Sequence, residues 1–137
     1  MQSLAENGVD PDNEHFIIKE YIDNMYTCMC ASDLIITRAG AMTLTELMAI
    51  GRASILIPYP YAAENHQYYN ALTLQNANAG RIIDDKELTG AVLIDTVTKL
   101  ADDPELLKLM SENAAKLSKH DAAGVILREI TDLMGLE

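Results

Sequence analysis

The sequence predicts an α/β domain with an open parallel sheet. Short apolar runs rich in β-branched residues, typical of strands buried on both faces, recur along the chain. Between them lie longer segments whose apolar residues repeat at three-to-four spacing, which indicates amphipathic helices. Where strands and helices alternate, right-handed crossovers make neighbouring strands parallel, so we expect Rossmann-like strand–helix units.

Length and charge restrict the class of protein. A chain of 137 residues can bury one core, so we expect a single domain over 1–137. The formal net charge of −11 argues against binding nucleic acid or an anionic membrane surface through this chain. No apolar run approaches the roughly 20 residues that span a bilayer, and the polar N-terminus does not resemble a signal peptide. These features predict a cytoplasmic location.

The first thirty residues predict a helix end, a turn, a strand and a short helix. The helix end covers 2–6, the turn 7–12, the strand 15–19 and the short helix 25–32, with a loop at 20–24. The four strands that the sequence predicts make a thin sheet for this fold class, and the chain begins with the end of a helix. This suggests that a leading strand–helix pair is missing.

The two cysteines, Cys28 and Cys30, lie two positions apart on the expected short helix and therefore point in different directions. No histidine or third cysteine stands at ligand spacing. The sequence predicts reduced, partly buried core cysteines, with no metal site and no cofactor.

The central stretch holds two strands joined through a helix. The strands cover 34–37 and 54–57, and the helix covers 42–50. Gly40, before the helix, can adopt backbone angles that residues with a Cβ resist, and Gly51 ends the helix. A strand, a glycine turn and a helix N-terminus form a common anion site, because free N–H groups and the positive end of the helix dipole face outward.

The second half predicts four helices and one strand. The first helix covers 65–78 and is closed by Gly80, and a strand at 81–84 follows. Three amphipathic helices finish the chain. The second of these begins with Asp103 as cap and Pro104 in the first turn.

Ligands of open α/β sheets bind beyond the carboxyl ends of the strands. By that rule the loops 21–23, 38–43 and 59–67 meet at one edge of the sheet. In the second loop, the Thr43 hydroxyl and the neighbouring N–H groups could hold a phosphate. The alternative is that Thr43 only caps the helix.

Glu46 follows Thr43 by three residues, on the same edge of the expected helix. A carboxylate there could accept hydrogen bonds from two vicinal hydroxyls, as acidic residues do for ribose at dinucleotide sites. The spacing equally fits a capping box, in which the carboxylate only supports the helix start.

Asn65, His66, Gln67 and Asn70 form a polar cluster at the start of the next helix, with more amides than an N-cap requires. Amides suit sugar hydroxyls because they both donate and accept hydrogen bonds. A lone histidine such as His66 is more often structural than catalytic. The sequence contains no HExxH, CxxC or GxxxxGK motif.

With these motifs the sequence resembles the C-terminal half of the MurG family. These bacterial glycosyltransferases add N-acetylglucosamine to the lipid-linked muramoyl-pentapeptide precursor of peptidoglycan. The resemblance rests on residues 21–25, 31–41, 43–46, 65–67 and 70–71. It extends more loosely to the C-terminus.

The resemblance implies a two-domain GT-B fold, of which this chain is a partial C-terminal domain that binds the donor, UDP-N-acetylglucosamine. In the family, N-acetylglucosamine passes to lipid I to give lipid II, with inversion at the anomeric carbon and without a metal. An acceptor hydroxyl attacks the anomeric carbon while a helix N-terminus stabilises the departing UDP.

The resemblance also implies a set of donor-binding positions, which are Ile22, Ala41, Met42, Thr43, Glu46, His66, Gln67 and Asn70. Ile22 would meet the uracil through its backbone, and Glu46 would accept the ribose hydroxyls. Residues 41–43 would face the diphosphate. Gln67 would bind the sugar hydroxyls, and His66 stands where the family has a second amide.

Two parts of the family pattern are absent from the sequence. These are the glycine-rich loop with the histidine that is the family's usual candidate base, and the GGS-type phosphate loop that opens the C-terminal domain. We therefore expect a piece of a larger enzyme, inactive alone and without catalytic residues. An N-terminal acceptor domain would complete it and hold the full-length protein on the inner face of the cell membrane.

Other functions fit part of the same pattern. The chain could be the donor subunit of a two-chain UDP-N-acetylglucosamine transferase like that of the dolichol pathway, although the absent GGS-type loop argues against it. It could also be a non-catalytic nucleotide-sugar-binding module. An apolar face exposed by truncation would permit a homodimer.

Overall fold

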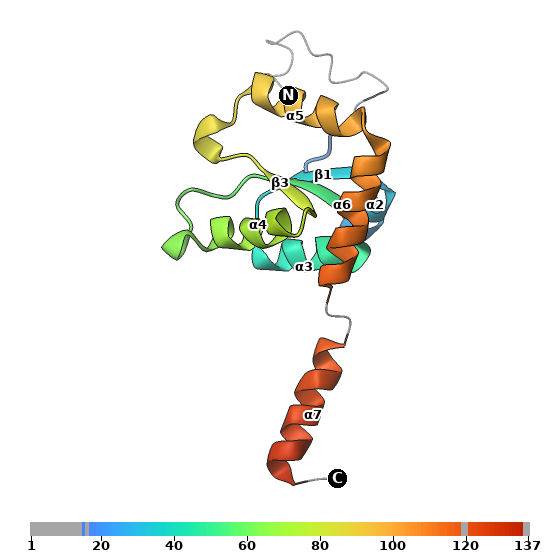
Figure 1. The fold of residues 1–137 in the computed structure, drawn as a ribbon, viewed down its shortest axis with the longest axis vertical. Helices are drawn as coiled ribbons and strands as arrows, with labels where there is room; N and C mark the ends of the chain where they lie inside the picture. Colours follow the sequence, from blue (N-terminus) through green and yellow to red (C-terminus); the bar gives the residue numbers. More distant parts are fainter. Residues whose placement is uncertain (1–14, 16, 119–120, 136–137) are drawn as a thin grey trace.

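The computed structural model describes residues 15, 17–118 and 121–135. Within them, one sheet of three parallel strands has the order β1 (Leu34–Thr37), β2 (Ala53–Leu56) and β3 (Gly80–Ile82). The registers pair Thr37 with Leu56 and Leu56 with Ile82, so all three strands end at the same edge. The predicted α/β class and parallel sheet are confirmed (Figure 1).

Helices and short 3-10 turns connect and follow these strands. They are α2 (Met25–Ala31), α3 (Ala41–Ile50), η1 (Ala63–Asn65), α4 (His66–Asn76), η2 (Asp85–Glu87), α5 (Gly90–Ala101), α6 (Pro104–Leu117) and α7 (Ala122–Met134). The predicted start of α6 is confirmed, because Asp103 caps it by accepting from the N–H of Leu106 at 3.0 Å and Pro104 is its first residue.

Side chains of the central strand β2 alternate between two cores. Leu56 points into a core that it shares with α2, α3 and α4, where Leu47 of α3 and Leu74 of α4 are almost fully buried. Ile55 points into the core formed with α5 and α6, which includes Met110. Burial on both faces explains why every residue of β2 except the buried Ser54 is apolar.

Helix α3 ends as the sequence predicts. Gly51 adopts the left-handed conformation with φ +63°, and its N–H bonds back to the last turn. A Cβ at this position would lie 3.0 Å from the Cβ of Ala115 on α6. Glycine therefore both ends α3 and lets α6 pack close to it.

The strand predicted at 15–19 is wrong over its described residues. Residues 17–19 form a loop, and the side chain of Ile17 is 86% exposed. A strand needs a partner backbone and a buried face, and an apolar run alone supplies neither. Phe16 and the elements predicted at 2–12 lie outside the described residues.

Gly80 does not close the preceding helix. Helix α4 ends at Asn76, Asn78 turns the chain with φ +53°, and Gly80 is the first residue of β3. A Cβ on Gly80 would lie 3.1 Å from Oγ of Ser54. Glycine is used here because β3 approaches β2 closely, and the strand predicted at 81–84 covers 80–82 instead.

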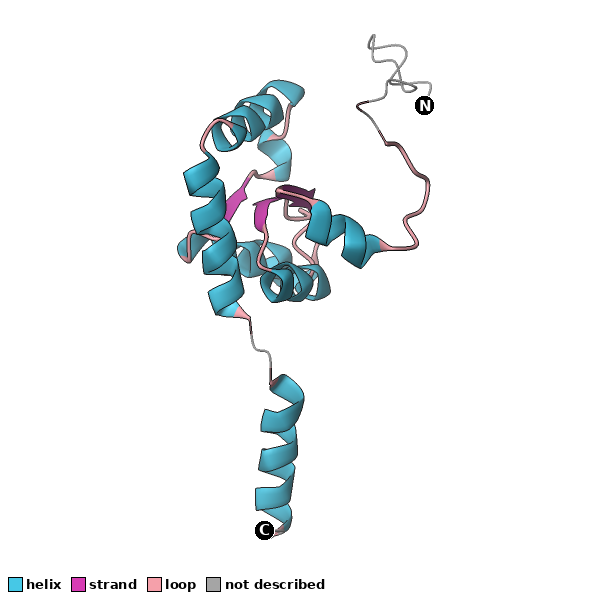
Figure 2. Cartoon of the chain, turned by 90° about the vertical axis from the view of Figure 1, so that its right-hand side faces the viewer, coloured by secondary structure: helices cyan, strands magenta, loops and turns pink. Residues whose placement is uncertain are grey.

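Helix α7 extends away from the sheet and its covering helices (Figures 1 and 2). None of its described residues is buried, and Leu133 is 87% exposed. No helix in the described part of the chain combines the length and the apolar character that crossing a membrane requires.

Candidate functional site

The candidate site lies beyond the common carboxyl edge of the strands. The turn after β1 leads into α3, and the loop after β2 leads through η1 into α4. Because β1 and β2 are parallel and in register at their ends, both connections leave from the same edge.

The N-terminus of α3 has no side-chain cap. Its cap residue is Gly40, whose backbone is extended, and the first helical hydrogen bond runs from Leu44 N–H to the carbonyl of Gly40 at 3.0 Å. Ala41 and Met42 are exposed, and Met42 is 76% exposed. The N–H groups of the first turn therefore face outward and can bind an anion.

Thr43 is not the cap of α3, so the capping alternatives for Thr43 and Glu46 are wrong. The helix begins at Ala41, which makes Thr43 its third residue and places Glu46 in the second turn. Gly40 takes the cap position with an ordinary extended backbone, φ −67° and ψ 142°, so the unusual backbone angles predicted for this glycine are not used, and the cap lies three residues before Thr43. Glu46 is exposed, and its carboxylate has no hydrogen bond or ion pair with another described residue.

The start of α4 is set by a tight turn. Glu64 and Asn65 both have positive φ, of 48° and 56°, and Asn65 makes no side-chain cap bond. Nδ1 of His66 lies 2.7 Å from the carbonyl oxygen of Ala63. A carbonyl only accepts, so this contact places the proton on Nδ1 and leaves Nε2 as the acceptor of the neutral ring.

Gln67 and Asn70, on the first turns of α4, each bond to one of the two connections. Oε1 of Gln67 accepts the backbone N–H of Tyr59 at 2.9 Å. Nδ2 of Asn70 donates to the carbonyl of Ala39 at 3.3 Å, and Ala39 is fully buried in the turn before α3. The Asn70 contact holds the N-terminal parts of α3 and α4 side by side.

Ile22 is not brought to this edge by any described hydrogen bond. It is half-buried in the loop before α2, and this loop arcs outward from the sheet in Figure 2. The sequence places the loop 21–23 at this edge because it would follow a strand at 15–19, and residues 17–19 form no strand. Seven of the eight predicted positions therefore lie on α3 and α4, and Ile22 lies in the loop before α2.

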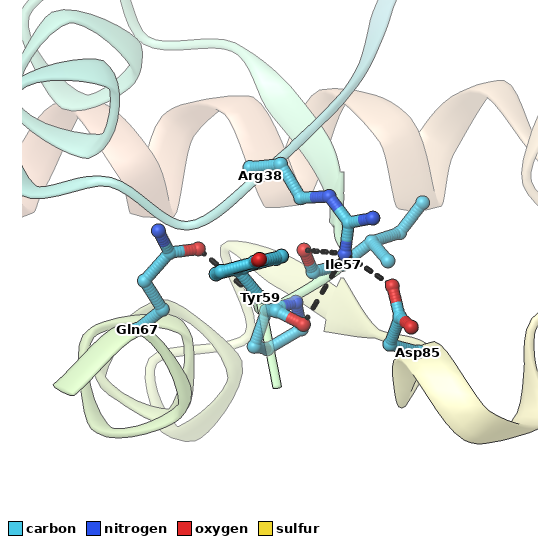
Figure 3. A network of polar contacts seen from close by, with 6 residues as sticks. Arg38, Ile57, Tyr59, Gln67 and Asp85 are labelled. Atoms are coloured by element: carbon cyan, nitrogen blue, oxygen red, sulfur yellow. Dashed lines mark hydrogen bonds and ion pairs between the residues drawn. The ribbon is translucent and has the colours of Figure 1, made fainter. Parts of the chain in front are cut away.

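Arg38 is central to this edge, although the sequence predicts no role for it. Its Nη1 donates to the carbonyls of Ile57 and Pro58 at 3.3 and 3.4 Å and forms an ion pair with Asp85 (Figure 3). Its guanidinium carbon lies 5.7 Å from the ring centroid of Tyr59. The sequence feature that could have indicated this role is the position of a charged residue directly after a buried strand.

A hollow of about 270 Å³ adjoins this network. Its lining includes Pro58, Asn65, Tyr68 and Asp85, and it borders none of the eight predicted positions. Among the described residues, no three histidine, cysteine or acidic side chains are grouped to hold a metal ion.

The chain matches the model of the glycosyltransferase family 28 C-terminal domain over residues 1–126. Two relatives are named UDP-N-acetylglucosamine–N-acetylmuramyl-(pentapeptide) pyrophosphoryl-undecaprenol N-acetylglucosamine transferase. The relative from Desulforamulus reducens is 41% identical over 98% of this chain, and the one from Thermoanaerobacter sp. is 44% identical over 97%. The chain spans 36% of the length of each.

A solved structure gives the same result. The crystal structure of Acinetobacter baumannii MurG superposes with a TM-score of 0.84 and 30% identity, over 96% of this chain and 39% of that one. The family model, the relatives and the shared fold agree over nearly the whole chain. The chain belongs to the glycosyltransferase family 28 C-terminal domain family.

Proposed function

We propose that this chain binds UDP-N-acetylglucosamine and forms the donor half of an inverting N-acetylglucosamine transferase that makes lipid II from lipid I. The observation that carries the proposal is the N-terminus of α3, which has no side-chain cap, with the exposed carboxylate of Glu46 in the second turn. The names of the relatives supply the donor and the reaction.

The diphosphate is assigned to the start of α3. The N–H groups of Ala41, Met42 and Thr43 precede the first helical hydrogen bond, which is donated by Leu44. Three outward N–H groups and the positive end of the helix dipole favour a doubly charged group. The same groups would stabilise the charge that develops on UDP as it leaves the sugar.

The ribose is assigned to Glu46. At a rise of about 1.5 Å per residue, the Cα of Glu46 stands about 7.5 Å further along α3 than that of Ala41, a distance suited to the group next to the diphosphate. An ionised carboxylate only accepts hydrogen bonds, which suits two vicinal hydroxyl donors. Because Glu46 has no described partner to give up, binding would cost it no existing ion pair.

The sugar is assigned to the start of α4. Oε1 of Gln67 is occupied by Tyr59, which leaves its NH2 group to donate to a sugar hydroxyl. Nε2 of His66 can accept a hydrogen bond from a neighbouring hydroxyl. Asn70 holds α4 against the turn before α3, so sugar and diphosphate would be bound by one rigid unit.

The transfer itself needs groups that we assign to the rest of a full-length protein. The general base, the lipid I site and the contact with the inner face of the membrane would belong to an N-terminal acceptor domain. We therefore propose that this chain alone binds the donor and transfers nothing, and that Ile22 reaches the uracil only once its loop packs against that domain or the ligand.

Calorimetric titration with UDP-N-acetylglucosamine tests the proposal. Glu46→Gln should weaken binding by about 1–3 kcal/mol, roughly 5- to 150-fold, because the ribose hydroxyls lose a charged acceptor. Glu129→Gln, a matched change on exposed α7, should leave the affinity unchanged. Absence of saturable binding at millimolar ligand would refute donor binding by this chain, without altering its family membership.

A further inference from the structure

Arg38 connects the ends of all three strands. It follows β1 directly, its Nη1 donates to the carbonyls of Ile57 and Pro58 just after β2, and it pairs with Asp85 of η2 after β3 (Figure 3). Ile57 and Pro58 are buried, so their carbonyls depend on donors from within the protein. One side chain thus fixes where the loop after β2 begins.

The same side chain reaches the next residue of that loop. The Arg38 guanidinium lies 5.7 Å from the Tyr59 ring centroid, within the range of a cation–π contact. The backbone N–H of Tyr59 in turn donates to Oε1 of Gln67 at 2.9 Å. A continuous path of contacts therefore runs from Asp85 through Arg38 and Tyr59 to Gln67.

This path determines which way the Gln67 amide faces. An amide has one accepting oxygen and one donating nitrogen, and only the oxygen can bond to the N–H of Tyr59. If Tyr59 moves, the Gln67 side chain loses the contact that orients it and is free to rotate. The positive charge of Arg38 is already compensated by Asp85, and its Nη1 already has three acceptors, so this nitrogen of the guanidinium is held within the protein.

We infer that Arg38 is a positioning residue for the donor sugar. It is held in place by its ion pair with Asp85, and it acts through Tyr59 on the Gln67 amide. This inference rests on the proposed donor-binding function. Arg38 would then support the sugar-binding part of the site while leaving the nucleotide-binding part on α3 unaffected.

The coupling is tested first without a ligand, by NMR of the 15N-labelled chain. Asp85→Asn keeps the shape of the side chain and removes its charge, and should shift the Tyr59 amide resonance and speed its solvent exchange. Asp95→Asn, which removes the exposed ion pair with Lys99 on α5, should leave that resonance in place. A Tyr59 amide unchanged in Asp85→Asn and in Arg38→Met would overturn the path.

Binding then tests the role. Asp85→Asn should weaken UDP-N-acetylglucosamine binding about 5- to 10-fold and UDP binding less than about 2-fold, since only the sugar contact is disturbed. In Gln67→Ala, adding Asp85→Asn should cause no further loss, because both act through one amide.

Three outcomes would overturn the positioning role. Equal losses for UDP and UDP-N-acetylglucosamine would place Arg38 at the nucleotide, and additive losses in the double variant would separate it from Gln67. If the unchanged chain binds neither ligand, the donor-binding function fails and the sugar role with it, while the ligand-free NMR result still decides whether Asp85 controls Tyr59.

Discussion

The backbone N–H of Tyr59 donates to Oε1 of Gln67 at 2.9 Å. The side chain that the family resemblance assigns to the sugar is therefore held by the loop that precedes its own helix. Its oxygen is used inside the protein, and its nitrogen remains for a ligand. This division of roles can be tested with a single substitution.

Gln67→Glu keeps an acceptor for Tyr59 and removes the NH2 donor. We expect the Tyr59 amide to stay hydrogen-bonded in NMR spectra while the affinity for UDP-N-acetylglucosamine falls about tenfold, the usual effect of losing one hydrogen bond to a ligand. Affinity for UDP, which lacks the sugar, should change little. Unchanged sugar affinity would show that the Gln67 nitrogen does not contact the donor.

Gly51→Ala should destabilise the fold by about 1–3 kcal/mol, because alanine resists φ +63° and its Cβ would lie 3.0 Å from the Cβ of Ala115. Gly90→Ala is the matched control: Gly90 begins α5, and a Cβ there meets nothing within 4 Å. It should be neutral or slightly stabilising. Urea unfolding of both variants measures the difference, and equal stabilities would contradict the account of Gly51.

Asp103→Ala should lower the free energy of unfolding by about 0.5–2 kcal/mol. The Asp103 side chain accepts a hydrogen bond from the N–H of Leu106 at 3.0 Å, and alanine offers no acceptor to replace it. Asp103→Asn keeps an oxygen at the same place and should retain most of the stability. Thermal unfolding distinguishes the two. If the asparagine variant lost as much stability as the alanine variant, the capping bond would not be what stabilises the start of α6.

The hydrogen bond with Cys30 raises the pKa of Tyr26 above its ordinary value of about 10. Cys30→Ala should return the pKa toward that value, whereas Cys28→Ala should leave it raised. NMR titration of the Tyr26 ring measures both.

The raised pKa of Tyr26 also determines how its contribution to the stability of the fold changes with pH. The folded chain holds the Tyr26 proton more tightly than the unfolded chain, so this contribution is present below the unfolded pKa and is lost as pH rises through the folded pKa. A Tyr26 pKa that did not respond to Cys30→Ala would contradict the hydrogen bond as its cause.

The sequence predicted the local features of the fold that depend on neighbouring residues. The apolar run of β2, the glycine end of α3 at Gly51 and the Asp103–Pro104 start of α6 each carry their own signal. Features that depend on distant contacts were missed. Gly80 could end a helix or admit a neighbouring strand, and only its closeness to Ser54 decides between them.

In the candidate site, too, the sequence alone could not predict what depends on distant contacts. Its positions on α3 and α4 came from a family resemblance, because the spacing of Thr43 and Glu46 fits a capping box equally well. Only the cap at Gly40 excludes that alternative. The pair formed by Arg38 and Asp85 joins residues 47 positions apart, so no local pattern could reveal it.

The central claim is that the donor binds at the carboxyl edge of the sheet, and NMR mapping tests it most directly. Titrating the 15N-labelled chain with UDP-N-acetylglucosamine should perturb the amides of Ala41, Met42, Thr43, Glu46 and Gln67. A hollow of about 510 Å³ at the opposite, amino edge, bordered by Arg52 and Ser111, provides the comparison. Perturbations gathered around that hollow, or none at saturating ligand, would contradict the account.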